Sequence, residues 1–314
     1  MTLNQLKYVL ELVEAGSFTA AAQKLGLTQP ALSLQIQSLE NELDFKIVDR
    51  SRKPFELTPE GELFVEKARE IILLTESLAD LSLELGDKIQ GLLRIGIIPT
   101  LSPYLVPLFI SQLNRDYPDL KIEIQELITE EIVRKLNLGE LDAGLLSTPL
   151  EANIRIEPLF YEKFFLYVSD AHPLYGRDEI KATEIDTEKL WYLSEGNCFQ
   201  NQANAICPVS NPEQTGQLRY VSNSIESLRR IVESKNGATF IPELATISIP
   251  AELEEMVISI SEPGPFREIS LALSRLHSKE KQVQAFKETI LKNIPDRMKR
   301  KPSGVGLDTK IRIK

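Results

Sequence analysis

The sequence predicts an α/β protein in two parts: a small helical unit that ends in a β-hairpin, then a larger unit. Three observations support this. Residues 17–43 have the pattern of two short helices joined by a turn, residues 59–88 have one unbroken helical pattern, and from residue 91 strand-like and helical stretches alternate. A length of 314 residues also suits about two domains.

The composition is that of a globular protein, with 42% hydrophobic and 26% charged residues. No apolar run is long enough for a membrane span. The N-terminus lacks the features of an export signal, so we expect a cytoplasmic protein with reduced thiols. The net charge of -10 argues against coating nucleic acid by bulk charge, but it leaves room for a local basic surface.

The stretch "SFTAAAQKLGLTQPALSLQIQSLENEL" predicts a helix-turn-helix with its turn at Gly26. Ser17 and Thr28 suit the N-cap positions of the two helices, and Pro30 suits a first helical turn. Apolar residues of the second helix form one buried stripe: Leu32, Ile36, Leu39 and Leu43. The alternative is a plain helical hairpin with solvated glutamines.

The next stretch, "FKIVDRSRKPFELTPEG", predicts a two-stranded wing with a basic tip. Residues 1–60 contain six basic residues, and four of these lie within residues 46–53. Such a tip could contact phosphates while uncharged polar side chains of the helix read base edges. The candidate contacts with double-stranded DNA are Thr28, Gln29, Pro30, Ser33, Gln35, Arg50, Arg52 and Lys53.

The helical pattern of residues 59–88 has an apolar side that no other part of the first unit is large enough to cover. We therefore expect this helix to pair with a second copy of itself. A single buried core helix is the alternative.

In the larger unit the runs "GLLRIGIIPT", "KIEIQEL" and "LDAGLL" predict strands with helices between them. This alternation predicts a largely parallel sheet with helices on both faces and a ligand site at the carboxyl ends of its strands. Thr100 and Thr129 follow the first and second strands, so both are candidates for that site. Crossing strands are expected near residues 160 and 267.

The helix-turn-helix, the wing and the long helix together resemble the N-terminal third of LysR-type transcriptional regulators. The resemblance implies a winged helix-turn-helix DNA-binding domain at 1–58, a dimerisation helix and hinge at 59–90, and a periplasmic-binding-protein-like α/β regulatory domain at 91–296. The regulatory domain would divide into subdomain I, about 91–161 plus 267–296, and subdomain II, about 162–266. A dimer of dimers is expected, with RNA polymerase as a further candidate partner. Residues 297–314 carry seven basic residues, and we expect a disordered tail.

Cys198 and Cys207 are the only cysteines, and they lie nine residues apart. A metal pair, a structural disulfide, two unrelated core residues and a redox switch are the alternatives. His172 and His277 are the only histidines, so we expect no metal site and no cofactor. A helix that starts at Cys198, after Gly196 and Asn197, would direct N–H groups at its sulfur and favour the thiolate. Cys207, by contrast, lies in an apolar stretch that includes Val209.

The stretches "IGIIPTLSPYLVP", "EGNCFQNQANAIC" and "SIESLRRIVESKNGATFIP" resemble the peroxide-sensing members of the LysR family. The resemblance implies that Cys198 is the thiol attacked by hydrogen peroxide, that Cys207 resolves it as a reversible disulfide, and that a thiol reductant restores both. It also implies a peroxide pocket formed by Thr100, Thr129, Asn197, Gln200 and Arg267. The family commonly has a histidine before the first cysteine and an Arg-Asp pair after it. Asn197, Gln200 and Asn201 stand there instead, which leaves Arg229 and Arg267 as candidate charge partners.

Three classes of function compete. The leading one is a transcription regulator of the oxidative stress response, switched by peroxide. The second is a LysR-type regulator that binds a small organic effector between its two subdomains, with incidental cysteines. The third is a thiol peroxidase, but the DNA-binding third argues against an enzyme, and the motifs of serine hydrolases and P-loop enzymes are missing.

Overall fold

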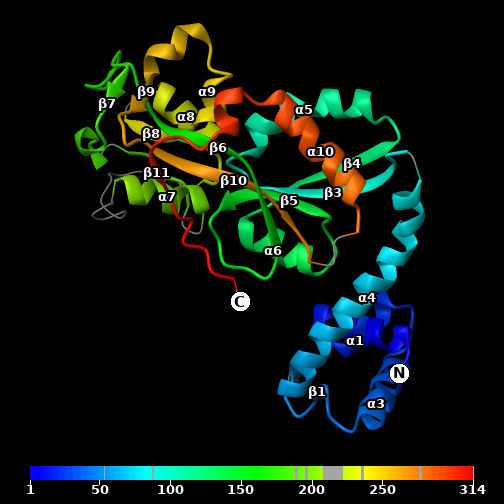
Figure 1. Cartoon of the computed structure of the whole chain (residues 1–314). Coiled ribbons are helices and arrows are strands. Elements are labelled where there is room, and N and C mark those ends of the chain that lie inside the picture. Colours follow the sequence, from blue (N-terminus) through cyan, green and yellow to red (C-terminus); the bar gives the residue numbers. More distant parts are fainter. Residues whose placement is uncertain are drawn as a thin grey trace. The chain divides into compact units, whose positions relative to one another are not determined.

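The computed structural model describes residues 1–52, 54–86, 88–187, 190–194, 197–207, 222–234, 237–275 and 278–313. They form two compact units, Met1–Leu85 and Gly86–Lys314, whose elements Figure 1 labels. Within the described ranges, no helix has both the length and the hydropathy that crossing a membrane requires. The predictions about Lys53, Gly196, Val209 and His277 lie outside the described residues.

The first unit has the helix-turn-helix and wing that the sequence predicts. Its elements are α1 (Leu3–Ala15), α2 (Phe18–Lys24), α3 (Gln29–Leu43), β1 (Val48–Asp49), β2 (Glu56–Leu57) and α4 (Pro59–Leu85). Ser17 caps α2 by accepting the Ala20 N–H at 3.1 Å, and Thr28 caps α3 by accepting the Ala31 N–H at 3.4 Å. β1 and β2 pair antiparallel, which confirms the wing.

Helix α4 packs on its own unit along one side only. Ala68 and Ile72 are buried in a small cluster with Leu6 of α1. Four large apolar side chains on α4 stay exposed, by 37 to 69%: Leu63, Ile71, Leu74 and Leu78. Because apolar surface of this extent is usually covered, α4 does not fit the alternative of a single buried core helix.

The second unit is built on one nine-stranded sheet in its described residues. Across the sheet the main order is β4 (Leu120–Glu126), β3 (Gly91–Ile97), β5 (Ala143–Thr148), β10 (Pro265–Leu273), β6 (Arg155–Val168), β9 (Val257–Ile260) and β7 (Glu179–Ile180). β8 (Ala238–Pro242) pairs with β6, and β11 (Val305–Gly306) pairs with β10. β3, β4 and β5 are parallel, as predicted, whereas β10 runs antiparallel to both of its neighbours in this order.

Helices cover both faces of this sheet (Figure 1). They are α5 (Ser102–Asp116), α6 (Thr129–Asn137), α7 (Cys198–Ile206), α8 (Ile225–Ser234), α9 (Glu243–Thr246) and α10 (Glu280–Asn293), with short 3-10 turns at Ala182–Glu184, Ala251–Met256 and Asp296–Lys299. α5 and α10 lie side by side on one face, where the rings of Phe109 and Phe286 meet edge to face with their centroids 5.3 Å apart. α6 covers the opposite face (Figure 1).

The crossing strands predicted near residues 160 and 267 are β6 and β10, which pair along most of β10, with Arg267 opposite Glu162. β6 continues beyond this ladder to pair with β8 and β9. The division of the regulatory domain into subdomains I and II stays a prediction.

The prediction of a disordered tail at 297–314 is wrong for its described residues. β11 joins β10, and Met298, Leu307, Thr309 and Ile311 are buried. The Ile313 N–H donates to the Glu151 carbonyl at 2.8 Å, and Glu151 N–H donates to the Ile311 carbonyl at 3.2 Å. We call residues 303–313 the C-terminal strap. Its ordering comes from apolar residues at alternate positions, which the many basic residues obscure.

Candidate functional site

The predicted DNA-contacting side chains lie on α3 and on the wing. Gln29, Pro30 and Gln35 are exposed, and Thr28 uses its hydroxyl to cap the helix. Ser33 accepts a hydrogen bond from Arg50 at 3.1 Å, so the wing is tied to the face of α3. The predicted contact residues of α3 are therefore uncharged, and Gln29, Ser33 and Gln35 offer hydrogen-bonding groups that suit base-edge recognition.

Both described arginines of the wing, Arg50 and Arg52, already contact side chains of their own unit. Arg50 also lies 3.5 Å from the buried carboxylate of Glu40 and over the ring of Phe18 at 5.1 Å. Arg52 pairs with Glu56 at 2.6 Å and keeps 62% of its side chain exposed. Arg50 consequently braces the wing against α3, while Arg52 is the more accessible cation of the two.

Both cysteines belong to α7, at its two ends. Asn197 is the N-cap and accepts the Phe199 N–H at 3.0 Å; Cys198 is the first helical residue and Cys207 is the C-cap. The predicted helix start at Cys198 is confirmed. Both thiols are free and buried. At a rise of about 1.5 Å per residue, nine residues of helix separate the two Cα atoms by about 13 Å, roughly twice the reach of a disulfide.

The buried thiol of Cys198 is influenced by side chains from two other elements, α6 and β10. The Thr129 hydroxyl, at the start of α6, and the Phe199 N–H both act to lower the pKa of its thiol. Arg267 of β10 is the cation that acts on it. Arg267 in turn donates to the Thr100 hydroxyl at 3.0 Å and to the Thr100 carbonyl at 3.2 Å. The structure thus brings together four predicted residues, which are Cys198, Thr100, Thr129 and Arg267.

A buried glutamate, not predicted from the sequence, completes this arrangement. Glu162 of β6 accepts the Arg267 Nε–H at 2.7 Å, and its other oxygen accepts the Leu244 N–H at 3.2 Å. The Arg267 guanidinium also lies over the ring of Phe199 at 4.8 Å. Arg267 is thereby fixed between the hydroxyl of Thr100 and the first turn of α7. The sequence does carry a signal for Glu162, because it is the one acidic residue within the apolar run "LFYEKFFLYV".

The expectation of a favoured thiolate at Cys198 is not met in the resting structure. Burial raises the pKa of the Cys198 thiol, and the charge of Arg267 and the hydrogen bonds from Thr129 and Phe199 only partly oppose this. Burial also raises the pKa of Glu162, against the opposing charge of Arg267. Burial thus favours the protonated thiol at Cys198, beside groups that act in the opposite direction.

Two other predicted neighbours of Cys198 have different roles. Gln200 accepts the Leu193 N–H at 2.8 Å and donates to Asn204 at 2.7 Å, so it links α7 to residues 190–194 rather than binding at the thiol. Arg229, the alternative charge partner, pairs with Glu226 and Glu233 of its own helix, each at 3.2 Å. Among the predicted charge partners, only Arg267 acts on Cys198.

Cys207 has a plainer, apolar environment, as predicted. Its side chain is part of the large core of the second unit, and its thiol donates to the Ala182 carbonyl at 3.5 Å. Burial raises its pKa as well. Within the described ranges, no cluster of three or more histidine, cysteine or acidic side chains could hold a metal ion.

Between the two cysteines, α7 is tied to the C-terminal strap, a contact that the sequence did not predict. Asn201 donates from Nδ2 to the Thr309 carbonyl at 2.9 Å, and Gln202 donates from Nε2 to the Leu307 carbonyl at 2.9 Å. Gln202 is fully buried and also bonds the Ser147 hydroxyl of β5 at 3.2 Å. The helix that separates the two thiols is thus held in place by side chains of its own polar face.

Two family models match the chain in its two parts. The model of the bacterial regulatory helix-turn-helix protein, lysR family, matches residues 3–62, and that of the LysR substrate binding domain matches residues 86–295. The chain is a LysR-type transcriptional regulator. Its N-terminal unit binds DNA through the helix-turn-helix, and members of this family regulate transcription rather than catalyse reactions.

Relatives of this LysR-type regulator include the hydrogen peroxide-inducible genes activator of Haemophilus influenzae, which is 31% identical over 95% of this chain and 100% of that protein. Among solved structures, a full-length OxyR variant from Pseudomonas aeruginosa matches with a TM-score of 0.70 and 30% identity, covering 93% of this chain and 98% of that one. An OxyR variant from Corynebacterium glutamicum, with hydrogen peroxide bound, matches with a TM-score of 0.60 and 26% identity, covering 93% and 92%.

Proposed function

We propose that this LysR-type regulator responds to hydrogen peroxide through a reversible disulfide between Cys198 and Cys207 and controls genes of the oxidative stress response. The observation that carries the proposal is the arrangement of Thr129, Arg267 and Thr100 around the Cys198 thiol, at one end of a helix whose other end is Cys207. Two similar proteins support this proposal: one is named as an activator of hydrogen peroxide-inducible genes, and the other is a solved structure with hydrogen peroxide bound.

The chemistry needs no cofactor. The Cys198 thiol loses its proton and attacks one oxygen of hydrogen peroxide; the O–O bond breaks, the sulfur becomes a sulfenic acid, and the leaving hydroxide takes up a proton as water. The Cys207 thiol then attacks that sulfur, and a second water leaves as the S–S bond forms. Peroxide has accepted two electrons. A thiol reductant returns two electrons and restores both thiols.

The Thr129 hydroxyl and Arg267 are suited to the first step, because both can stabilise negative charge on sulfur and direct hydrogen bonds at a small polar oxidant. Arg267 is positioned for this by its ion pair with Glu162, at 2.7 Å, and by Thr100. Asn197 contributes indirectly, because its cap fixes where α7 begins.

The second step requires α7 to unwind. Its ends must approach from about 13 Å to within about 7 Å for a disulfide to form. Since α7 contacts β5 and the C-terminal strap through Gln202, unwinding breaks bonds well away from the sulfurs. We propose that this rearrangement alters contacts between copies of the regulatory domain. A dimer held by α4, paired again into a tetramer, would carry the change to two DNA half-sites.

Mass spectrometry of the peptides that contain both cysteines, before and after one equivalent of peroxide, tests the proposal together with operator binding. The wild-type chain should lose two thiols, gain the Cys198–Cys207 link and change its operator affinity. With Cys198→Ser, peroxide should neither produce the link nor change the operator affinity. Cys207→Ser should be oxidised at Cys198 without the link, and with excess peroxide it should proceed to sulfinic acid.

The competing function is a regulator that responds to a small organic effector between its subdomains. If the wild-type chain forms no Cys198–Cys207 link while peroxide still changes operator binding, the switch proposal fails. If peroxide has no effect on either measurement, the organic-effector reading takes its place. Continued peroxide turnover with added reductant, at a rate that matches a dedicated peroxidase, would contradict both.

A further inference from the structure

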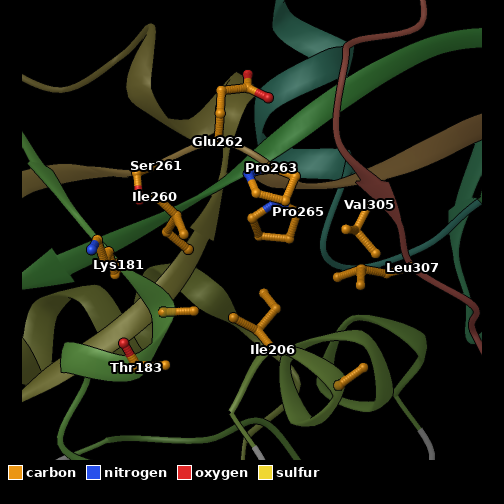
Figure 2. A pocket seen from close by; sticks show the side chains of 12 residues that line it. Lys181, Thr183, Ile206, Ile260, Ser261, Glu262, Pro263, Pro265, Val305 and Leu307 are labelled. Atoms are coloured by element: carbon orange, nitrogen blue, oxygen red, sulfur yellow. The ribbon is translucent and has the colours of Figure 1, made fainter.

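A largely apolar surface cavity lies at the C-terminal end of α7, whereas Cys198 lies at the N-terminal end of this helix. Its volume is about 390 Å³, within the usual range for small-molecule sites. Figure 2 shows side chains from four segments around it. They come from the turn after β7 (Lys181, Ala182, Thr183), the end of α7 (Ala205, Ile206), residues 260–263 with Pro265, and the strap (Val305, Leu307).

The strap closes one wall of this cavity and is firmly attached. The Val305 N–H donates to the Gly264 carbonyl at 3.0 Å, and the Leu307 N–H donates to the Phe266 carbonyl at 2.9 Å. The approach is so close that a Cβ at Gly304 would lie 2.2 Å from the Gly264 carbonyl oxygen. The strap wall of this surface cavity is therefore fixed by defined backbone contacts.

The cavity is coupled to the helix that carries both cysteines. Ala182, in its wall, accepts the Cys207 thiol hydrogen bond at 3.5 Å. Leu307, in the opposite wall, accepts the Gln202 side-chain bond at 2.9 Å. Ala205 and Ile206 are the last residues of α7 before Cys207. If α7 unwinds, as the proposed function requires, this wall and both bonds are lost.

The side chains that line the cavity indicate the class of ligand. Eight of the twelve lining residues are aliphatic, namely alanine, isoleucine, proline, valine and leucine residues. Glu262 at the rim is already engaged, by Lys163 at 3.5 Å and by the Ser303 hydroxyl at 3.4 Å. Lys181, at another edge in Figure 2, has no ion-pair partner within 4 Å among the described residues, which leaves its ammonium group for a ligand anion.

We propose that this cavity is a second ligand site, for a small aliphatic carboxylate, and that its ligand holds α7 in the helical, reduced form. The inference rests on the proposed function. The carboxylate lies at Lys181 and the aliphatic chain lies between Ile206 and Leu307. Because the ligand binds only the form with an intact α7, occupancy opposes disulfide formation. At ten times its dissociation constant, such a ligand shifts the thiol–disulfide equilibrium about elevenfold toward the thiols.

Octanoate is the probe. Its binding to the full-length reduced chain is measured by isothermal titration calorimetry, and its effect on the Cys198–Cys207 link is measured by thiol trapping in glutathione buffers of stepped ratio. Ala205→Phe fills the cavity from the helix surface and should abolish binding; Ala251→Phe, at an exposed alanine outside the cavity, should not. Lys181→Gln should weaken the binding of octanoate but leave the binding of octanol, its uncharged analogue, unchanged. Lys121→Gln, at an exposed lysine of β4, should change the binding of neither.

The outcomes separate the site from the switch. If octanoate binds, Ala205→Phe abolishes binding, and the redox midpoint moves toward the thiols, the inference is supported. If the disulfide forms normally but octanoate does not bind, or binds equally to Ala205→Phe, the inference fails and the proposed function stands. If no disulfide forms in any buffer, the proposed function fails, and with it the claim that the ligand regulates a switch; calorimetry then decides the site alone.

Discussion

Arg267 and Glu162 form an ion pair with neither side chain exposed, at 2.7 Å between Nε and Oε1, on adjacent strands that pair at this position. A buried pair of this kind adds little net stability in place of apolar residues, because both charges lose their hydration. Its value here is positional. It directs the guanidinium toward Thr100, Phe199 and the thiol of Cys198.

Removing one partner should therefore destabilise the second unit strongly. Arg267→Ala leaves the Glu162 carboxylate buried without its cation, and we expect a loss of about 3–5 kcal/mol in urea unfolding. The double variant Glu162→Leu with Arg267→Met removes both charges and should recover most of that loss. Arg312→Ala, at an exposed ion pair, is the control and should unfold like the wild type. A loss below about 1 kcal/mol for Arg267→Ala would contradict this role.

The pH dependence of oxidation should follow the raised pKa of Cys198. Only the thiolate attacks peroxide, and below the pKa its fraction rises tenfold per pH unit. The rate of sulfenic acid formation should thus rise about tenfold per unit from pH 6 to pH 8, without a plateau below about pH 9, the ordinary value from which this pKa is raised. Stopped-flow measurements on Cys207→Ser isolate this step.

Thr129→Val provides the matched comparison, because it keeps the shape of the side chain but removes a hydrogen bond that lowers the pKa of Cys198. Its rate should be lower than that of the parent at each pH in this range. A rate independent of pH between 6 and 8 would show that Cys198 reacts from a preformed thiolate.

Substitutions in the wing and in α3 should affect DNA binding in different ways. Arg52→Ala removes the accessible wing cation and should weaken all sequences alike, with the salt slope reduced by about one unit. Gln29→Ala should cost about 1–3 kcal/mol on the operator and little on a scrambled duplex. Arg50→Ala should resemble neither, because loss of its contact with Ser33 also loosens α3 against the wing. Titration of both duplexes at several salt concentrations distinguishes these results. Identical losses for Arg52→Ala and Gln29→Ala on both duplexes would refute the assignment.

The exposed stripe of α4 should hold a dimer. Leu74→Glu and Leu78→Glu place charges at positions that are 51% and 69% exposed in the single chain. We therefore expect each variant to fold normally and to dissociate at micromolar concentrations in sedimentation experiments. Glu66→Lys, an exposed change on the same helix, should leave the assembly intact. Dimers that persist in both leucine variants would place the interface elsewhere.

Most elements of both units could be predicted from periodicity and capping, and so could the start of a helix at Cys198. Thr100 and Thr129 were found because residues that follow parallel strands meet at one edge of a sheet. The partner of Arg267 was not found. Glu162 lies 105 positions away in the chain, and only the strand register brings the two together.

The strap was missed for a different reason. Its basic residues outweighed the alternation of Leu307, Thr309 and Ile311, all of which are buried. Gln202 is also a polar residue that is fully buried, and its partners are the Ser147 hydroxyl and a strap carbonyl. In both cases the local composition favours solvent exposure, but contacts with segments remote in sequence bury these residues.

Strand β6 belongs to both halves of the regulatory unit: its first part pairs with β10, and its last part pairs with β8 and β9. Neither half can unfold without breaking strand pairing in which β6 also serves the other half. Residues 86–314 should consequently melt as a single cooperative block, with one heat-absorption peak and equal calorimetric and van't Hoff enthalpies. One half of the regulatory unit therefore cannot unfold while the other stays folded, so the structural change at α7 has to stay local.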